Sequence, residues 1–127
     1  MAKARSKRPP QIVAMGGGGF LMEPTNPRLD DYVLGLTGAA RPKIAYLGTA
    51  GADSAWGSDR FRWCFQAPRA HPTVIPLFLR DATPLRDTVL AQDAIYVGGG
   101  NTVNLLAIWR AHGLDRIKHL LALAKHV

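Results

Sequence analysis

A short apolar run that ends in three consecutive glycines constrains the fold of this chain more than any other stretch of its sequence. Residues Ala94 to Val97 are apolar and favour a strand, and Gly98 to Gly100 follow directly. An apolar-periodic segment comes next, which predicts a helix over Thr102 to Ala111 with Asn101 or Thr102 as its N-cap. The stretch therefore predicts a strand, a tight glycine turn and a helix.

Two interpretations of this glycine turn are open. Residues without a Cβ atom let backbone N–H groups approach a ligand closely, and the positive end of the following helix favours negative charge there. The turn would then hold an anion or a developing oxyanion. In the alternative interpretation, the junction between strand and helix needs glycine only for steric reasons.

The same alternation of apolar strands and helices runs through the rest of the chain. Apolar runs predict three further strands, at residues 11–15, 43–47 and 73–79. Pro76 makes the last of these an edge strand or a bulged one. Helical spacing predicts four further helices, at residues 29–36, 53–67, 85–90 and 114–125. Nearly all-apolar strands that alternate with helices predict an α/β domain, with a mostly parallel sheet and helices on both faces.

Three of the four predicted strands end in turns that contain glycine, at residues 16–19, 48–51 and 98–100. Ligands of open parallel sheets bind beyond the carboxyl ends of the strands. If the three strands are neighbours, the three turns meet in one crevice made largely of backbone.

Composition narrows the class of protein. The chain has 127 residues, of which 47% are hydrophobic, so we expect a single domain, at 11–127. Residues 1–10 are polar and basic, and we expect them to form a disordered leader. The net charge of +7 suggests nucleic acid as a possible partner. The lysines and arginines, however, are concentrated in the leader and are otherwise scattered among acidic residues, so we expect no nucleic-acid partner. No apolar run reaches the length of a membrane span, and a single cysteine fits a reducing compartment. We therefore expect a cytoplasmic protein without a membrane partner.

Outside the glycine turns, no motif identifies a cofactor, a metal site or a nucleophile. Gly16 to Gly19 do not have the G-x-G-x-x-G spacing of the dinucleotide-binding motif, and no helix is expected to begin directly after them. No glycine loop carries the Gly-Lys-Ser/Thr of a P-loop. The histidines lack the partners of a metal site. No serine lies in G-x-S-x-G, Ser54 is interpreted as a helix cap, and Cys64 is expected in the core. We therefore expect no cofactor and no metal.

Several segments together carry a resemblance to a known family. They are IVAMGGGGF at 12–20, KIAYL at 43–47 and IYVGGGNT at 95–102, followed by Leu105-Leu106, Trp109-Arg110 and Gly113-Leu114-Asp115. In these residues the chain resembles the peptidase E family of serine peptidases, which includes aspartyl dipeptidases and, more distantly, cyanophycinases. The resemblance covers about residues 11–124 and implies a class I glutamine amidotransferase-like, flavodoxin-like three-layer fold and peptide substrates.

The resemblance also implies roles for the glycine turn. In the family, the last glycine of GGGN supplies a backbone N–H group to the oxyanion, which corresponds here to Gly100, and Gly99 and Asn101 would line the substrate site. The family's serine lies in G-x-S-A-G, on the strand after the helix predicted here at 114–125, and its histidine and acid come later. The chain therefore resembles the N-terminal half of such an enzyme, and we expect it to be inactive alone.

A chain that lacks the following strand would expose an apolar sheet edge, so self-association is expected. Two other functions stay open. One is a non-catalytic α/β module that binds an anion or a small molecule at its glycine turns. The other, less favoured, is a nucleic-acid-binding protein, which would rest on the basic leader.

Overall fold

The centre of the fold is a parallel sheet of three strands in the order β3–β2–β4. β2 (Lys43–Leu47) lies in the middle, with β3 (His71–Val74) on one side and β4 (Ala94–Val97) on the other. In register, Ala45 of β2 is opposite Thr73 of β3 and Ile95 of β4. The computed structural model describes residues 9–117 and 125–126, so residues 1–8 of the expected leader lie outside the described residues.

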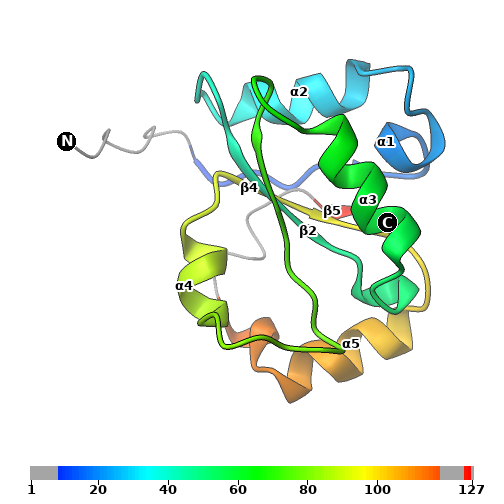
Figure 1. Ribbon diagram of the computed structural model, residues 1–127, viewed down its shortest axis with the longest axis vertical. Helices are drawn as coiled ribbons and strands as arrows, with labels where there is room; N and C mark the ends of the chain where they lie inside the picture. Colours follow the sequence, from blue (N-terminus) through cyan, green and yellow to red (C-terminus); the bar gives the residue numbers. More distant parts are fainter. Residues whose placement is uncertain (1–8, 118–124, 127) are drawn as a thin grey trace.

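Two short strands form a second parallel pair. β1 (Ala14–Met15) pairs with β5 (Lys125–His126), and β5 also lies close to β4 (Figure 1). Among the described strands, β1 is hydrogen-bonded only to β5.

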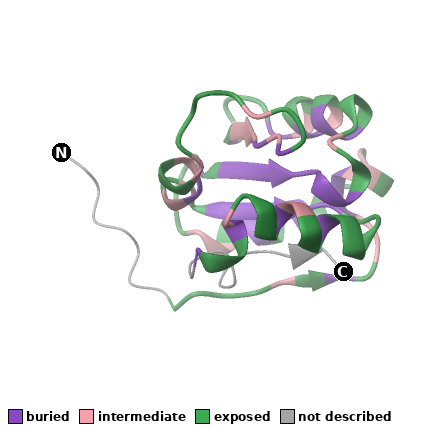
Figure 2. Ribbon diagram, turned by 90° about the horizontal axis from the view of Figure 1, so that it is seen from below, coloured by how far each residue is buried: buried purple, intermediate pink, exposed green. Residues whose placement is uncertain are grey.

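Helices cover both faces of the sheet. α1 (Gly19–Met22), α2 (Arg28–Leu36) and α3 (Ala55–Cys64) lie on one side, whereas α4 (Leu85–Leu90) and α5 (Thr102–Ala111) lie on the other (Figure 1). Two single turns of 3-10 helix also contact α5: η1 (Thr49–Gly51), between β2 and α3, and η2 (Leu114–Arg116), after α5. Burial is concentrated in the strands between the two helical layers (Figure 2). The predicted three-layer α/β fold with a parallel sheet is confirmed.

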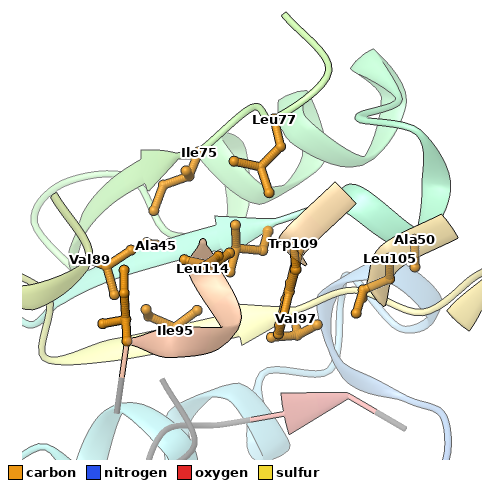
Figure 3. Close-up of a cluster of buried hydrophobic side chains, with 12 residues drawn as sticks. Ala45, Ala50, Ile75, Leu77, Val89, Ile95, Val97, Leu105, Trp109 and Leu114 are labelled. Atoms are coloured by element: carbon orange, nitrogen blue, oxygen red, sulfur yellow. The ribbon is translucent and has the colours of Figure 1, made fainter. Parts of the chain in front are cut away.

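Alternation along the strands divides the core into two clusters. Ala45 and Leu47 of β2 contribute to the cluster on the α5 side, together with Trp109 and Leu105 of α5 (Figure 3). Ile44 and Tyr46 point to the opposite face, which is rich in aromatic side chains. Period-two alternation of this kind is what a strand covered on both faces requires.

Phe20 is the centre of the aromatic cluster. Its ring centroid lies 4.8 to 5.5 Å from four other aromatic rings, those of Tyr46, Phe61, Phe65 and Tyr96. The edge-to-face geometry of these pairs adds to the free energy gained by burial. The phenylalanine that follows the first glycine run therefore fixes α1 to the sheet.

Four predicted elements have the predicted bounds: the strands at 43–47 and 94–97 and the helices at 85–90 and 102–111. Others differ. α1 begins directly at Gly19, where no helix was predicted, because Gly17 to Gly19 all adopt positive φ and so turn the chain at once. The strand predicted at 73–79 is wrong beyond Val74, since the N–H groups of Leu77 and Phe78 donate to a side chain. The first predicted strand and the helix predicted at 53–67 are both shorter than expected, at 14–15 and 55–64.

The helix predicted at 114–125 is wrong in its described parts. Residues 114–116 form only the single 3-10 turn η2, and Ile117 is extended, with ψ near 100°. Leu114, in this turn, and Ile117, directly after it, are both buried against α5 and the sheet. Lys125 and His126 belong to β5, because pairing with β1 satisfies their backbone in the sheet. Residues 118–124 lie outside the described residues.

Arg69 joins the ends of α2 and α3. Its Nη2 and Nε atoms donate to Oδ1 of Asp31 at 2.6 and 3.2 Å, and Nη1 donates to the carbonyl oxygen of Cys64 at 2.7 Å. The guanidinium group also lies 5.0 Å from the centroid of the Phe65 ring. The side chain thus satisfies a carbonyl group at the carboxyl end of α3 and one carboxylate of α2.

Replacing Arg69 with methionine is expected to lower the free energy of unfolding by about 1 to 2 kcal/mol, because one substitution removes an ion pair and a helix-end hydrogen bond. Urea denaturation, monitored by circular dichroism, measures this loss in free energy of unfolding. Arg62→Met is the matched control. Among the described residues, Arg62 makes only an exposed pair with Asp59, at 3.3 Å, and its loss should cost less than about 0.5 kcal/mol. Equal losses for the two variants would contradict the assigned role of Arg69.

Within the described residues, no helix is long and apolar enough to cross a membrane.

Candidate active site at the glycine turns

The turns after β2 and β4 lie against each other at the carboxyl edge of the sheet. The N–H group of Gly98 donates to the carbonyl oxygen of Leu47 at 3.0 Å, which continues the strand pairing by one residue. Three residues further, the N–H group of Asn101 donates to the carbonyl oxygen of Ala50 at 2.8 Å. Adjacent strands thus bring two of the three predicted turns together, as parallel topology requires.

Gly100 is held by a steric requirement. Its φ is +144°, and a Cβ atom built on it would lie 2.3 Å from the carbonyl oxygen of Ala50 and 3.1 Å from the nitrogen of Gly51. No side chain fits there without moving the backbone of the facing turn. The steric interpretation of the glycine run is therefore correct for Gly100.

The same packing leaves two backbone donors available. In residues 9–117 and 125–126, the N–H groups of Gly99 and Gly100 donate to no acceptor, and both glycines are exposed. They immediately precede α5, whose first turn contributes further partial positive charge. Successive exposed donors at the amino end of a helix can stabilise an anion or an oxyanion. The steric and the anion-binding interpretations are thus compatible.

Asn101 is the N-cap of α5, as predicted. Its Oδ1 atom accepts a hydrogen bond from the N–H group of Asn104 at 2.9 Å, and the residue is exposed. Its backbone N–H group is occupied by Ala50, so only its amide NH₂ group could reach a ligand. The substrate-lining role implied for Asn101 stays a prediction.

The facing turn, residues 48–53, is supported from two directions. Trp109 of α5 donates its indole N–H group to Oγ1 of Thr49 at 3.1 Å, within the core. On the other side, Oδ2 of Asp53 accepts from the N–H groups of Leu77 and Phe78 at 2.7 and 2.9 Å. Neither contact could be predicted from the sequence, because the partners lie far apart in the chain and no local pattern marks them.

Asp53 lies outside α3, although the helix was predicted to begin at residue 53. α3 begins at Ala55, and Asp53 lies before it with φ of +56°, next to Ala52 at +57°. Left-handed backbone at two successive non-glycine residues is uncommon and persists only where surrounding contacts hold it. Here the two hydrogen bonds of the Asp53 carboxylate fix the turn.

The first glycine turn lies elsewhere. β1 is not bonded to β2 or β4, and a Cβ atom on Gly19 would meet Oη of Tyr96 at 2.3 Å and Oδ1 of Asp30 at 3.3 Å. Residues 16–19 therefore approach the aromatic face of the sheet and touch the side chain of Tyr96. Of the three turns expected to meet, backbone hydrogen bonds among the described residues join only the second and third, and a crevice there stays a prediction.

Asp30 is a buried acid on this face, only 2% exposed. Burial raises its pKa to about 6, against the smaller lowering effects of Arg69 and of the hydrogen bond from the Phe20 N–H group, while Asp31 adds to the rise. Its Oδ1 atom has no hydrogen-bond partner among the described residues. Burial and the nearby Asp30 also raise the pKa of Tyr96.

The remaining sequence candidates supply no nucleophile. Ser54 occupies the N-cap position of α3 as predicted, although its side chain makes no capping hydrogen bond, and Ser58 is buried within α3. Burial is the largest cause of the raised pKa of Cys64, which keeps its thiol protonated and unreactive. Among the described residues, no group of three or more His, Cys, Asp or Glu side chains could hold a metal ion.

Comparison with known proteins agrees with the resemblance found in the sequence. The sequence profile of peptidase family S51 matches residues 12–122, which include both facing turns. An uncharacterized peptidase, YgaJ of Bacillus subtilis (strain 168), is 47% identical over 107 residues, covering 84% of this chain and 46% of that protein. This chain thus spans about half the length of the curated relative that it matches. A match of this extent confirms that the chain belongs to peptidase family S51, the family of peptidase E.

Proposed function

We propose that residues 98–101 form the oxyanion side of a serine-peptidase site that cleaves peptide substrates. The observation that carries this proposal is the pair of exposed N–H groups at Gly99 and Gly100, which have no acceptor among the described residues. When a serine hydroxyl attacks a peptide carbonyl, the carbonyl oxygen gains negative charge, and the N–H group of Gly100 would donate to it. Gly99 and Asn101 would contact the substrate beside that oxygen.

Preorganisation supports this role. The N–H group of Asn101 is tied to Ala50, and the facing turn is in turn fixed by Asp53 and by Trp109. A donor that is already oriented needs no rearrangement when charge develops, and one such donor contributes on the order of 3 kcal/mol to transition-state stabilisation.

The nucleophile is not proposed within these 127 residues. None of the three serines lies in a G-x-S-x-G sequence, and Ser58 is buried in α3. We therefore infer that the serine, its base and the orienting acid are supplied by residues outside this sequence, and that the 127-residue chain does not hydrolyse peptides alone.

The purified 127-residue chain, its mass verified, is expected to give no turnover of aspartyl dipeptides. A chimera that continues residue 127 with the C-terminal part of the Bacillus subtilis relative is expected to give turnover, because it joins oxyanion donors to a serine. The readout is release of free amino acids. Turnover by the 127-residue chain that survives both Ser54→Ala and Ser58→Ala would overturn the assignment, as it would require a nucleophile other than these two serines within the 127 residues.

The structure changes the basis of the predicted self-association. β5 lies beside β4, where an open edge was expected, and the outer edge of β3 has no strand partner among the described residues. β3 contains Pro72 and is followed by Pro76, which both lack an N–H donor and so discourage pairing of a further strand. Self-association through a sheet edge stays a prediction, as does a cytoplasmic location.

A further inference from the structure

A pocket of about 650 Å³ lies between the loop after α1 and the outer face of α3. Its lining residues are Pro24, Thr25, Arg60 and Trp63. α1 and α3 are side by side on the same face of the sheet (Figure 1). None of the lining residues belongs to the glycine turns, so the site described above does not explain the pocket.

Arg60 is the charged group of this pocket, and two contacts hold it in place. Its guanidinium carbon lies 4.8 Å from the centroid of the Trp56 ring, and Nη1 donates to the carbonyl oxygen of Leu21 at 3.4 Å. Among the described residues Arg60 forms no ion pair, whereas Arg62 on the same helix pairs with Asp59. A partly buried guanidinium group is thus positioned with most of its donors unused.

The surroundings of Arg60 are apolar and unusually exposed. Trp56 and Trp63 lie four residues before and three residues after it, so all three share one face of α3. The exposed fractions are 61% for Trp56 and 68% for Trp63, and Met22 of α1 is 66% exposed. Tryptophan, methionine and arginine are the residues enriched where proteins bind partners, and exposing several of them together is unfavourable without a ligand.

We propose that this pocket binds a carboxylate-bearing ligand, whose carboxylate pairs with Arg60 and whose apolar group lies against Trp63. The planar guanidinium group matches a carboxylate in a two-pronged arrangement. A single cation lines the pocket, which favours a monoanion over a phosphate, and Pro24 and Trp63 favour an apolar neighbour to that charge. This inference goes beyond the peptidase proposal and does not depend on it.

The test uses 3-phenylpropionate as the probe, with tryptophan fluorescence of the 127-residue chain as the readout. A saturable change is expected for the acid, and binding at least about tenfold weaker for its uncharged amide, 3-phenylpropanamide. Binding of the acid is expected to weaken as salt is added. Equal binding of acid and amide, or competition by inorganic phosphate at similar concentration, would overturn the proposal.

Arg60→Gln is expected to weaken binding of the acid at least about tenfold, whereas the matched control Arg62→Gln keeps wild-type binding. Circular dichroism verifies that both variants are folded, and Arg60→Lys, which keeps the charge without the planar fork, should bind with intermediate affinity. Unchanged binding in Arg60→Gln would overturn the proposal. A second probe, N-acetyl-glutamyl-phenylalaninamide, distinguishes the source: a response to this peptide alone identifies a peptide carboxylate, and a response to the free acid alone a small organic acid. A saturable response to neither probe would refute the site.

Discussion

Replacing Gly100 with alanine is expected to lower the free energy of unfolding by about 2 to 4 kcal/mol. The added Cβ atom would lie 2.3 Å from the carbonyl oxygen of Ala50, so the turns after β2 and β4 must separate. Separation breaks the hydrogen bond from Asn101 to Ala50, and alanine must also adopt a φ of +144°. Urea denaturation of the 127-residue chain, followed by circular dichroism, measures the effect.

Gly51→Ala is the matched control for this substitution, because Gly51 lies on the opposite side of the same contact. A Cβ atom on Gly51 would meet nothing closer than the carbonyl oxygen of Gly99, at 4.0 Å. The free energy of unfolding should therefore change by less than about 1 kcal/mol. Similar losses in the two variants would show that the turns tolerate no side chain in general, which would contradict a specific contact at Gly100.

The parts of the fold that could be predicted from sequence are those with strong local signals at both ends. β2 and β4 are apolar runs that stop at glycine, and α5 begins at an asparagine that caps it. In each case the residues that give the sequence signal lie within a few positions of the interaction that forms the element. The family resemblance rested on the same segments, and comparison confirmed it.

The parts that could not be predicted depend on distant partners. The sequence predicts a helix at 114–125, yet Lys125 pairs in register with Ala14 near the other end of the chain. Beyond Ile75, the N–H groups of Leu77 and Phe78 donate to the carboxylate of Asp53 rather than to a neighbouring strand. Helical periodicity reports only local preference, so long-range pairing of this kind overrides it without leaving a signal.

The candidate site also has features that could be predicted from sequence and features that could not. The exposed donors of the glycine turn were predicted, because a glycine run before a capped helix has a local meaning. The reason that Gly100 must be glycine was left between two interpretations, since Ala50 approaches it only through the pairing of β2 with β4. Asp30 was not singled out, because in sequence it resembles any acid in the first turn of a helix, and only the packing of α1 over α2 buries it.

Burial of Asp30 predicts an unusual dependence of stability on pH. Its pKa is raised from 3.8 to about 6 in the folded protein, chiefly by burial, so folding favours the neutral carboxyl group. The stabilisation is complete below about pH 4 and is lost as the pH rises through 6. A shift of about two units corresponds to roughly 3 kcal/mol of unfolding free energy between pH 4 and pH 7.

Asp30→Asn is expected to remove this loss, because an amide has no charge to bury. The measurement is urea denaturation at half-unit steps from pH 4 to pH 8, comparing wild type with the variant. At pH 8 the variant should be the more stable protein, and the difference should shrink toward pH 4, where wild-type Asp30 is neutral as well.

The matched control is Asp87→Asn, which neutralises an exposed acid in the first turn of α4 and should leave the slope of the wild-type profile unchanged. Arg69 and Asp31, which also act on Asp30, are intact in both variants, so any difference in slope belongs to position 30. If wild type and Asp30→Asn lose stability in parallel as the pH rises, folding does not raise the pKa of Asp30. Because its Oδ1 atom has no partner among the described residues, that result would require water or another group to reach the buried end of Asp30 beneath the first glycine turn.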